Sequence, residues 1–234
     1  MVDVNKNIEL NNQLSDLYAR YTVDFLSIYS QTFNDAPPKR TNEFGIIDIE
    51  KYDADNGVLF IGKETNGWRN EDFEQGILFR GWLHNMSKNG LEGYGHAKKH
   101  PNIWYNMGRW AQTILAPDTD TEKIASMKYE ALQALGAIAV TNINKVRGYN
   151  SSKKEYDAIA YSDIAGKVLC EEIRILKPKI IVTCGNCRSV CYHLNNAGLL
   201  DEIKMICMPH PAVRLATRPI IEDLKKQLDF LRNN

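Results

Sequence analysis

The chain has 234 residues, of which 29 are Lys or Arg and 29 are Asp or Glu, so its formal net charge is zero. Charged residues make up 25% of the chain, and no apolar run approaches the roughly 18 to 20 residues of a membrane helix, which excludes a spanning protein. Residues 1–10 lack the apolar stretch of a signal peptide, so we expect a cytoplasmic protein that meets any polyanion through a local basic patch.

The chain shows no repeat or low-complexity tract, which predicts a single domain over residues 1–234 with an N-terminal helical extension at about 1–40. In that extension, residues 11–29 place leucines and tyrosines at helical spacing, as in an amphipathic packing helix. Four later runs have strand length, are rich in Val and Ile, and are apolar at nearly every position: residues 57–61, 137–141, 179–184 and 203–208. Helical patterns lie at residues 102–116, 121–135, 153–176, 186–197 and 219–231.

This alternation predicts an α/β fold, a three-layer α/β/α sandwich with a central, mostly parallel four-stranded sheet. In such sheets ligands gather outside the carboxyl ends of the strands. Polar segments follow all four apolar runs, at residues 62–68, 141–148, 185–188 and 208–214. Taken singly, Gly62 and Gly185 could be turn glycines and His210-Pro211 a turn, but the occurrence at four strand ends indicates one shared site.

In their order along the chain, these motifs resemble those of the uracil-DNA glycosylase superfamily. Gly62-Lys63-Glu64 is similar to the first motif, in which a catalytic Asp or Asn takes the third place, and His210-Pro211-Ala212 is similar to the last. The branch that carries an iron–sulfur cluster is the most similar, through the Thr-Asn-x-x-Lys-x-Arg pattern of residues 141–147 and the Gly-x-x-Phe-x-Gly pattern of residues 76–81. The resemblance covers about residues 58–218.

The resemblance implies a DNA glycosylase that hydrolyses the N-glycosidic bond of a flipped uracil or modified pyrimidine. Its catalytic residues would be Glu64, which stabilises the cationic sugar and orients the attacking water, and His210, which donates to a carbonyl oxygen of the departing base. No lysine takes the carboxylate position, so water would be the nucleophile and the enzyme monofunctional. A strand-end histidine with a purely structural role is the alternative for His210.

The base would be bound by Gly62, Asn66, Phe79 and Asn142. Phe79 would offer a stacking face, unless it is a core residue, and the amide of Asn142 can pair with a pyrimidine edge through one donor and one acceptor. Asn66 stands where the uracil-specific branch has a Tyr that excludes 5-methyl groups. The pocket is therefore expected to accept a 5-substituted or otherwise modified pyrimidine.

Phosphate contacts are expected from the cations in the polar segments that follow the apolar runs and from the residues after the His-Pro motif. One of the residues after the His-Pro motif would fill the space that the flipped base leaves in the DNA. These DNA-binding residues are Lys63, Lys145, Arg147, Arg214 and Leu215. The partner would be single- or double-stranded DNA. The protein is expected to be a monomer and to have no membrane partner.

Five cysteines are an odd number at low density, which predicts reduced thiols. The iron–sulfur branch has cluster ligands upstream of the first motif, whereas the first cysteine here is Cys170, so neither a cluster nor another cofactor or metal is expected. Cys184, Cys187 and Cys191 supply three soft ligands without an obvious fourth, and are expected to be packing thiols.

Two other functions stay open. A nucleic-acid-binding module that no longer cleaves is compatible with Glu64 in place of Asp or Asn, because one added methylene displaces the carboxylate by more than about 1 Å, enough to cost 10²-fold in rate. A hydrolase of free nucleosides or nucleotides is compatible with zero net charge.

Overall fold

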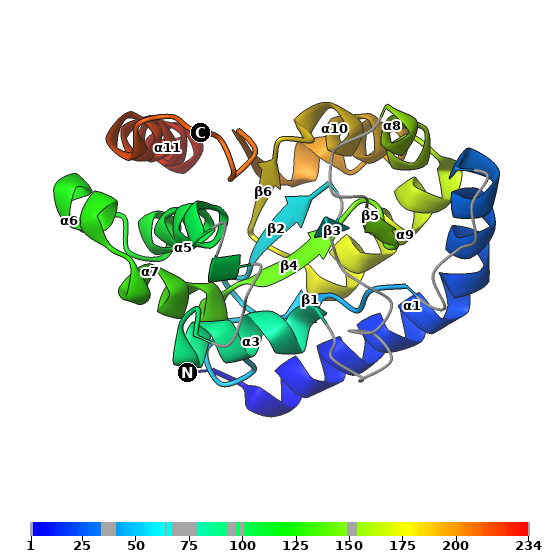
Figure 1. Ribbon diagram of the computed structural model, residues 1–234, viewed down its shortest axis with the longest axis horizontal. Coiled ribbons are helices and arrows are strands. Elements are labelled where there is room, and N and C mark those ends of the chain that lie inside the picture. Colours follow the sequence, from blue (N-terminus) through cyan, green and yellow to red (C-terminus); the bar gives the residue numbers. More distant parts are fainter. Residues whose placement is uncertain are drawn as a thin grey trace.

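A five-stranded sheet with helices on both faces forms the centre of the protein in the computed structural model, which describes residues 2–33, 41–63, 65–66, 79–92, 97–98, 101–148 and 154–233 (Figure 1). Its strands lie in the order β1-β4-β2-β6-β7. They are β1 (Gly45–Ile46), β2 (Val58–Gly62), β4 (Ala139–Asn142), β6 (Ile180–Cys184) and β7 (Lys204–Met208). A separate pair joins β3 (Thr65–Asn66) to β5 (Arg147–Gly148).

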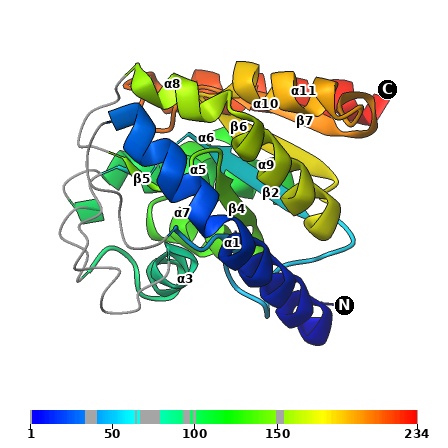
Figure 2. The ribbon, with the colours of Figure 1, turned by 90° about the vertical axis from the view of Figure 1, so that its right-hand side faces the viewer.

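The helices fall on the two faces of this sheet. On one face lie α1 (Val4–Phe33), α8 (Glu155–Ala160), α9 (Asp163–Leu176) and α10 (Cys187–Asn196) (Figures 1 and 2). On the other lie α3 (Phe79–Asn89), α5 (Pro101–Leu115), α6 (Thr121–Ser126), α7 (Tyr129–Ala134) and α11 (Thr217–Asn233). Short 3₁₀ turns span Leu135–Ala137 and Leu200–Glu202. Among the described helices, none has the length and apolar character needed to cross a membrane.

The α/β class predicted from the sequence is confirmed, since all four apolar runs form strands and those four strands are parallel to one another. The predicted count of four strands is wrong. A fifth strand, β1, pairs antiparallel with β4 at one edge and makes the sheet mixed. With two residues, β1 is too short to produce a periodic pattern in the sequence.

The edge of β1 that does not pair with β4 lies against α1, where it bonds to Asn11. The side-chain oxygen of Asn11 accepts from the backbone N–H of Ile46 at 2.9 Å, and its amide nitrogen donates to the Ile46 carbonyl at 3.2 Å. These bonds occupy the backbone groups of Ile46 that a further strand would need for pairing. The same helix buries Leu14 and Leu17 completely, so α1 belongs to the core.

Two of the helical patterns are each divided into two helices. Between α6 and α7 the chain is extended at Met127, whose carbonyl accepts from Nε of Arg109 at 2.9 Å. Between α8 and α9, the hydroxyl of Ser162 caps α9 by accepting from the Ala165 N–H at 3.3 Å. A polar partner at the break replaces the helical hydrogen bonds lost there, which apolar periodicity does not reveal.

Replacement of Gly108 by Ala is expected to destabilise the protein by about 1–3 kcal/mol, because it overpacks the contact between α5 and α7. A Cβ at Gly108 would lie 2.0 Å from the backbone carbonyl oxygen of Ala131. Gly81→Ala in α3 is the matched control, since a Cβ there meets nothing within 4 Å. In urea unfolding, the free energy of unfolding of this control should equal that of the unsubstituted protein or be slightly higher. Equal effects of the two substitutions would contradict the packing described.

Candidate functional site

The carboxyl ends of the four parallel strands form one row at the edge of the sheet. Gly62 of β2 pairs with Asn142 of β4, and Cys184 of β6 pairs with Met208 of β7. Asn186 joins the two pairs, because its side-chain amide donates to the Gly62 carbonyl at 2.9 Å and its side-chain oxygen accepts from the Cys184 N–H at 3.1 Å. The strand ends singled out in the sequence therefore lie side by side.

Gly62 and Asn142 are in direct contact. A Cβ at Gly62 would lie 2.2 Å from Oδ1 of Asn142, so the glycine leaves the space that the asparagine side chain takes. Asn142 is 6% exposed, and the next residue, Ile143, donates its N–H to the Gly62 carbonyl at 2.9 Å. Two of the predicted base-binding residues are thus brought together.

The β3–β5 pair continues beyond this row. Thr65 pairs with Arg147 and Asn66 with Gly148, so the segments that follow β2 and β4 run in parallel. The side chains of Asn66 and Arg147 lie outside the described part of the structure, and so does the whole of Glu64. Their predicted roles stay predictions.

The loop that carries His210 is held by a contact within the loop and by contacts from the turn after β6 and from α5. Gly185, with a φ of +83°, donates its N–H to the Met208 carbonyl at 2.9 Å, and a Cβ at Gly185 would lie 3.0 Å from the Cβ of His210. The His210 carbonyl accepts from the Val213 N–H at 2.9 Å. Asn106 of α5 donates to the Pro211 carbonyl at 2.8 Å. The loop after β7 is thereby fixed to both β6 and α5.

The ring of His210 has a defined tautomer. Its Nδ1 lies 3.1 Å from the backbone N–H of Ala212, and because that group can only donate, Nδ1 accepts and the neutral ring carries its proton on Nε2. Although the residue keeps an exposed surface, the protein atoms packed around the ring lower the pKa of His210 below 6.5, and the charge of Lys63 lowers it further. His210 is therefore a neutral Nε2–H donor at neutral pH.

Lys63 lies on the same rim. Its ammonium pairs with Asp157 of α8 at 2.9 Å, and its side chain is 24% exposed. Arg214 and Leu215 are exposed in the loop that follows His210. These positions are compatible with contacts to DNA.

Lys145 does not lie where the sequence predicted, and the assignment of this residue to phosphate binding is wrong. Its side chain is completely buried, and Nζ lies 2.7 Å from each carboxylate oxygen of Glu172 in α9. Nζ also donates to the Thr141 hydroxyl at 2.6 Å and to the Asn142 carbonyl at 2.5 Å. Burial lowers the pKa of Lys145, while the carboxylate of Glu172 acts in the opposite direction.

Two hydroxyls complete this buried cluster, which fixes the backbone of Asn142 from inside. Tyr18 of α1 donates to Oε1 of Glu172 at 2.5 Å, and Thr141 donates to the same oxygen at 2.8 Å. Burial and the charge of Glu172 raise the pKa of Tyr18 well above its usual value. A signal for this cluster is present in the sequence, since Glu172 interrupts the apolar stripe of α9 and a buried carboxylate needs a buried cation.

Phe79, expected as a stacking face for the base, is 5% exposed and packs in the core. Its ring centroid lies 5.4 Å from that of Phe44 and 6.1 Å from that of Trp82. This packing favours the alternative stated above, that Phe79 is a core residue. It begins α3, which lies outside the helical patterns found in the sequence.

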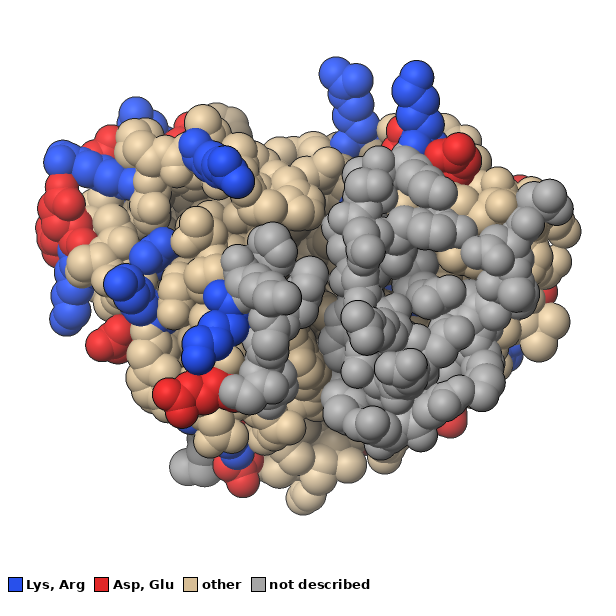
Figure 3. Space-filling model, in the orientation of Figure 1, with Lys and Arg blue, Asp and Glu red and all other residues tan. Residues whose placement is uncertain are grey.

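On the face seen in Figure 3, the basic side chains of the described residues are interspersed with acidic ones on the side of α6 and α11. Arg218 shows the consequence, because it pairs with Glu122 at 2.5 Å and with Glu222 at 2.8 Å. A cavity of about 810 Å³ lies elsewhere, among α1, α9 and the residues that precede β2 and β6. It is thus at the amino end of the strands, away from the row of strand ends.

The cysteines differ from expectation at two positions. Cys187 and Cys207 form a disulfide, so the prediction of five reduced thiols is wrong for this pair, while Cys170, Cys184 and Cys191 are free. Within the described ranges, no group of His, Cys, Asp or Glu side chains is arranged to hold a metal ion.

No protein-family model matches the chain, and no curated protein is similar to it in sequence. The resemblance to the uracil-DNA glycosylase superfamily therefore depends on the sequence motifs alone.

Lys145→Met is expected to lower the free energy of unfolding by about 3–5 kcal/mol, because it leaves the carboxylate of Glu172 buried without its cation. The double variant Lys145→Met/Glu172→Leu should cost less than this single one, since it removes both charges. Lys6→Met, which breaks the exposed pair with Asp55, is the control and should leave urea unfolding unchanged. A Lys145→Met protein as stable as the control would contradict the buried pair.

The imidazole of His210 is expected to titrate below pH 6.5, with Nε2 protonated in the neutral form, in a ¹⁵N NMR titration assigned with His210→Gln. Since the folded pKa is lowered, the stability that His210 contributes is complete above pH 6.5 and is lost as the pH falls through the folded pKa. Lys63→Met should move the midpoint up towards 6.5, whereas the distant Lys6→Met should not. A midpoint above 6.5, or a proton on Nδ1, would contradict the environment described.

Proposed function

We propose that the protein is a monofunctional DNA glycosylase that uses water to hydrolyse the N-glycosidic bond of a flipped uracil or modified pyrimidine. The observation that carries the proposal is His210, a neutral histidine whose Nδ1 accepts from the Ala212 N–H, so that Nε2 carries the proton, and which follows β7 by two residues in the same row of strand ends as Asn142. The proposal includes a uracil-DNA glycosylase-like version of the α/β fold.

The geometry of the row supports the recognition of one base. Three strand spacings of about 4.8 Å, roughly 14 Å in all, separate β4 from β7. Two side chains and one pyrimidine ring can span that separation. The amide of Asn142 would pair with the edge of the ring, and its backbone cannot shift easily because Lys145 holds its carbonyl from below. A fixed amide discriminates between donor and acceptor patterns on the base.

The electrostatics of His210 suit the departure of an anionic base. As the glycosidic bond breaks, negative charge develops on the carbonyl oxygen, and an Nε2–H donor already in place stabilises it. The positive charge of Lys63, which lowers the pKa of His210, also favours that anion. A neutral donor has the further advantage that it does not need to lose a proton before the next cycle.

Glu64 is the proposed partner on the sugar side. It stands two residues after Gly62 in the sequence, where the family has a catalytic Asp or Asn. A carboxylate at this place would stabilise the oxocarbenium-like sugar and orient the attacking water. Phosphate contacts are proposed from Lys63, Arg147 and Arg214, with Arg214 or Leu215 filling the space left by the flipped base.

One observation favours a second candidate, a hydrolase of free nucleosides or nucleotides. The burial of Lys145 removes one cation from the predicted DNA surface of a chain that has no net charge. DNA binding that weakens steeply with rising salt would speak against this candidate.

Base release is expected from oligonucleotides that contain uracil, a thymine mispair, or 5-hydroxymethyl or glycosylated pyrimidines, measured as strand scission after alkali. His210→Gln should lower the rate by about 10²–10³, because it removes a preorganised donor. Glu64→Gln should abolish release and leave DNA binding nearly unchanged.

The outcomes separate the candidates. Binding without release from any substrate would indicate a non-catalytic module, and release from nucleosides alone would indicate the second candidate. Release of plain uracil only would contradict the wider pocket that Asn66 suggests. Lys6→Met serves as the control, since its ammonium pairs with Asp55 on the surface, away from the strand ends.

A further inference from the structure

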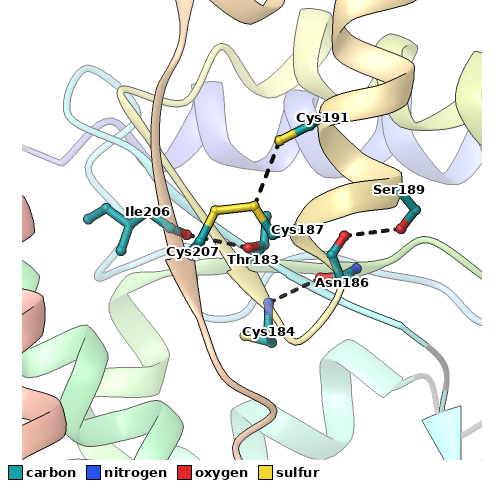
Figure 4. Close-up of a disulfide and its surroundings, with 8 residues drawn as sticks. All are labelled: Thr183, Cys184, Asn186, Cys187, Ser189, Cys191, Ile206 and Cys207. Atoms are coloured by element: carbon teal, nitrogen blue, oxygen red, sulfur yellow. Dashed lines mark hydrogen bonds between the residues drawn. A yellow bond between two sulfur atoms is a disulfide. The ribbon is translucent and has the colours of Figure 1, made fainter.

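The Cys187–Cys207 disulfide connects two elements that bear on His210. Cys187 is the first residue of α10, two positions after Gly185, and Cys207 lies in β7, three positions before His210 (Figure 4). Their Cα atoms are 5.7 Å apart, a usual separation for bonded cysteines. Cys207 is exposed and Cys187 is half-buried, so reagents in solution can approach the bond.

A third cysteine lies next to this disulfide. Cys191 follows Cys187 by one helical turn, and its Sγ lies 3.7 Å from the Sγ of Cys187 (Figure 4). It is free and half-buried. Cys170 and Cys184 differ from it, because both are buried and burial raises the pKa of each thiol, to about 12 for Cys184. Buried thiols of raised pKa are poor nucleophiles.

We propose that Cys187, Cys191 and Cys207 form a thiol–disulfide exchange site, in which Cys187 pairs with either of the other two. The thiolate of Cys191 attacks Sγ of Cys187, the Cys187–Cys191 bond forms as the Cys187–Cys207 bond breaks, and Cys207 leaves as a thiolate. Cys207 then takes up one proton to replace the one that Cys191 lost. The exchange involves no net oxidation or reduction, so it needs no co-reactant.

The two pairings differ in what they hold together. The Cys187–Cys207 bond ties α10 to β7, whereas a Cys187–Cys191 bond lies within α10 and removes the covalent link to β7, which keeps its hydrogen bonds to β6. The released strand leads directly into the loop of His210. An effect of the exchange on base release rests on the proposed function, but the exchange itself does not.

Peptide mapping tests the exchange directly, because trypsin separates the three cysteines. Cleavage after Lys179, Arg188, Lys204 and Arg214 places Cys187 in peptide 180–188, Cys191 in 189–204 and Cys207 in 205–214. Protein purified without reductant would be incubated at pH 6.5 and 8.5, quenched in acid, alkylated with N-ethylmaleimide, digested and analysed by mass spectrometry. Cys184 shares a peptide with Cys187, so the experiment is run in Cys184→Ser as well.

We expect peptide 180–188 to be linked to both of the other peptides, with the linkage to 189–204 appearing at least tenfold faster at pH 8.5 than at 6.5, because the thiolate is the attacking species. Cys191→Ser should show only the linkage to 205–214, and Cys207→Ser only that to 189–204. Cys170→Ser is the matched control and should behave like the wild type. A single linkage to 205–214 at both pH values, or no linkage at all, would overturn the proposal.

These outcomes do not depend on DNA. If base release is absent from every variant while both linkages appear, the proposed function fails and the exchange site stands. If base release is present and equal in Cys191→Ser and Cys207→Ser, the exchange does not act on His210.

Discussion

The buried ion pair between Lys145 and Glu172 is the interaction on which the edge of the sheet depends. Both side chains are completely buried, so neither charge can return to water without unfolding the region around it. The pair draws together the end of β4, helix α9 and, through the hydroxyl of Tyr18, helix α1. Three further groups, the hydroxyls of Tyr18 and Thr141 and the carbonyl of Asn142, form hydrogen bonds with the carboxylate or the ammonium. The carbonyl of Asn142 is one of them, so the position of the candidate site follows from the way these charges are accommodated.

The other residues in the row of strand ends are also held by contacts that involve the backbone. Gly62 leaves room for the side chain of Asn142, Asn186 joins the ends of β2 and β6, and Gly185 allows His210 to pack against the turn after β6. The backbone N–H of Ala212 then decides which nitrogen of His210 carries the proton. A side chain held in this way loses little freedom when a ligand binds, which is the property that the proposed stabilisation of a leaving group requires.

Much of the fold could be predicted from the sequence, because strands covered on both faces are apolar at nearly every position and stand out as short runs. The strands β1, β3 and β5 have two residues each and leave no periodic signal. The site could be predicted only in part. The motifs located Gly62, Asn142 and His210 correctly at the strand ends, but they could not show that Lys145 points inward, because a cation in a rim motif looks the same whether it faces phosphate or a buried carboxylate. Glu172 is 27 residues further along the chain, and only the folded protein brings the two together.

The proposed function requires that a single pyrimidine ring lies between the ends of β4 and β7. A crystal structure of the protein with uracil, or with the modified base that the substrate panel identifies, tests it most directly. We predict that the side-chain amide of Asn142 and Nε2 of His210 both form hydrogen bonds with the edge of the ring. This prediction is contradicted if packed side chains fill that space, or if the base binds instead in the cavity between α1 and α9.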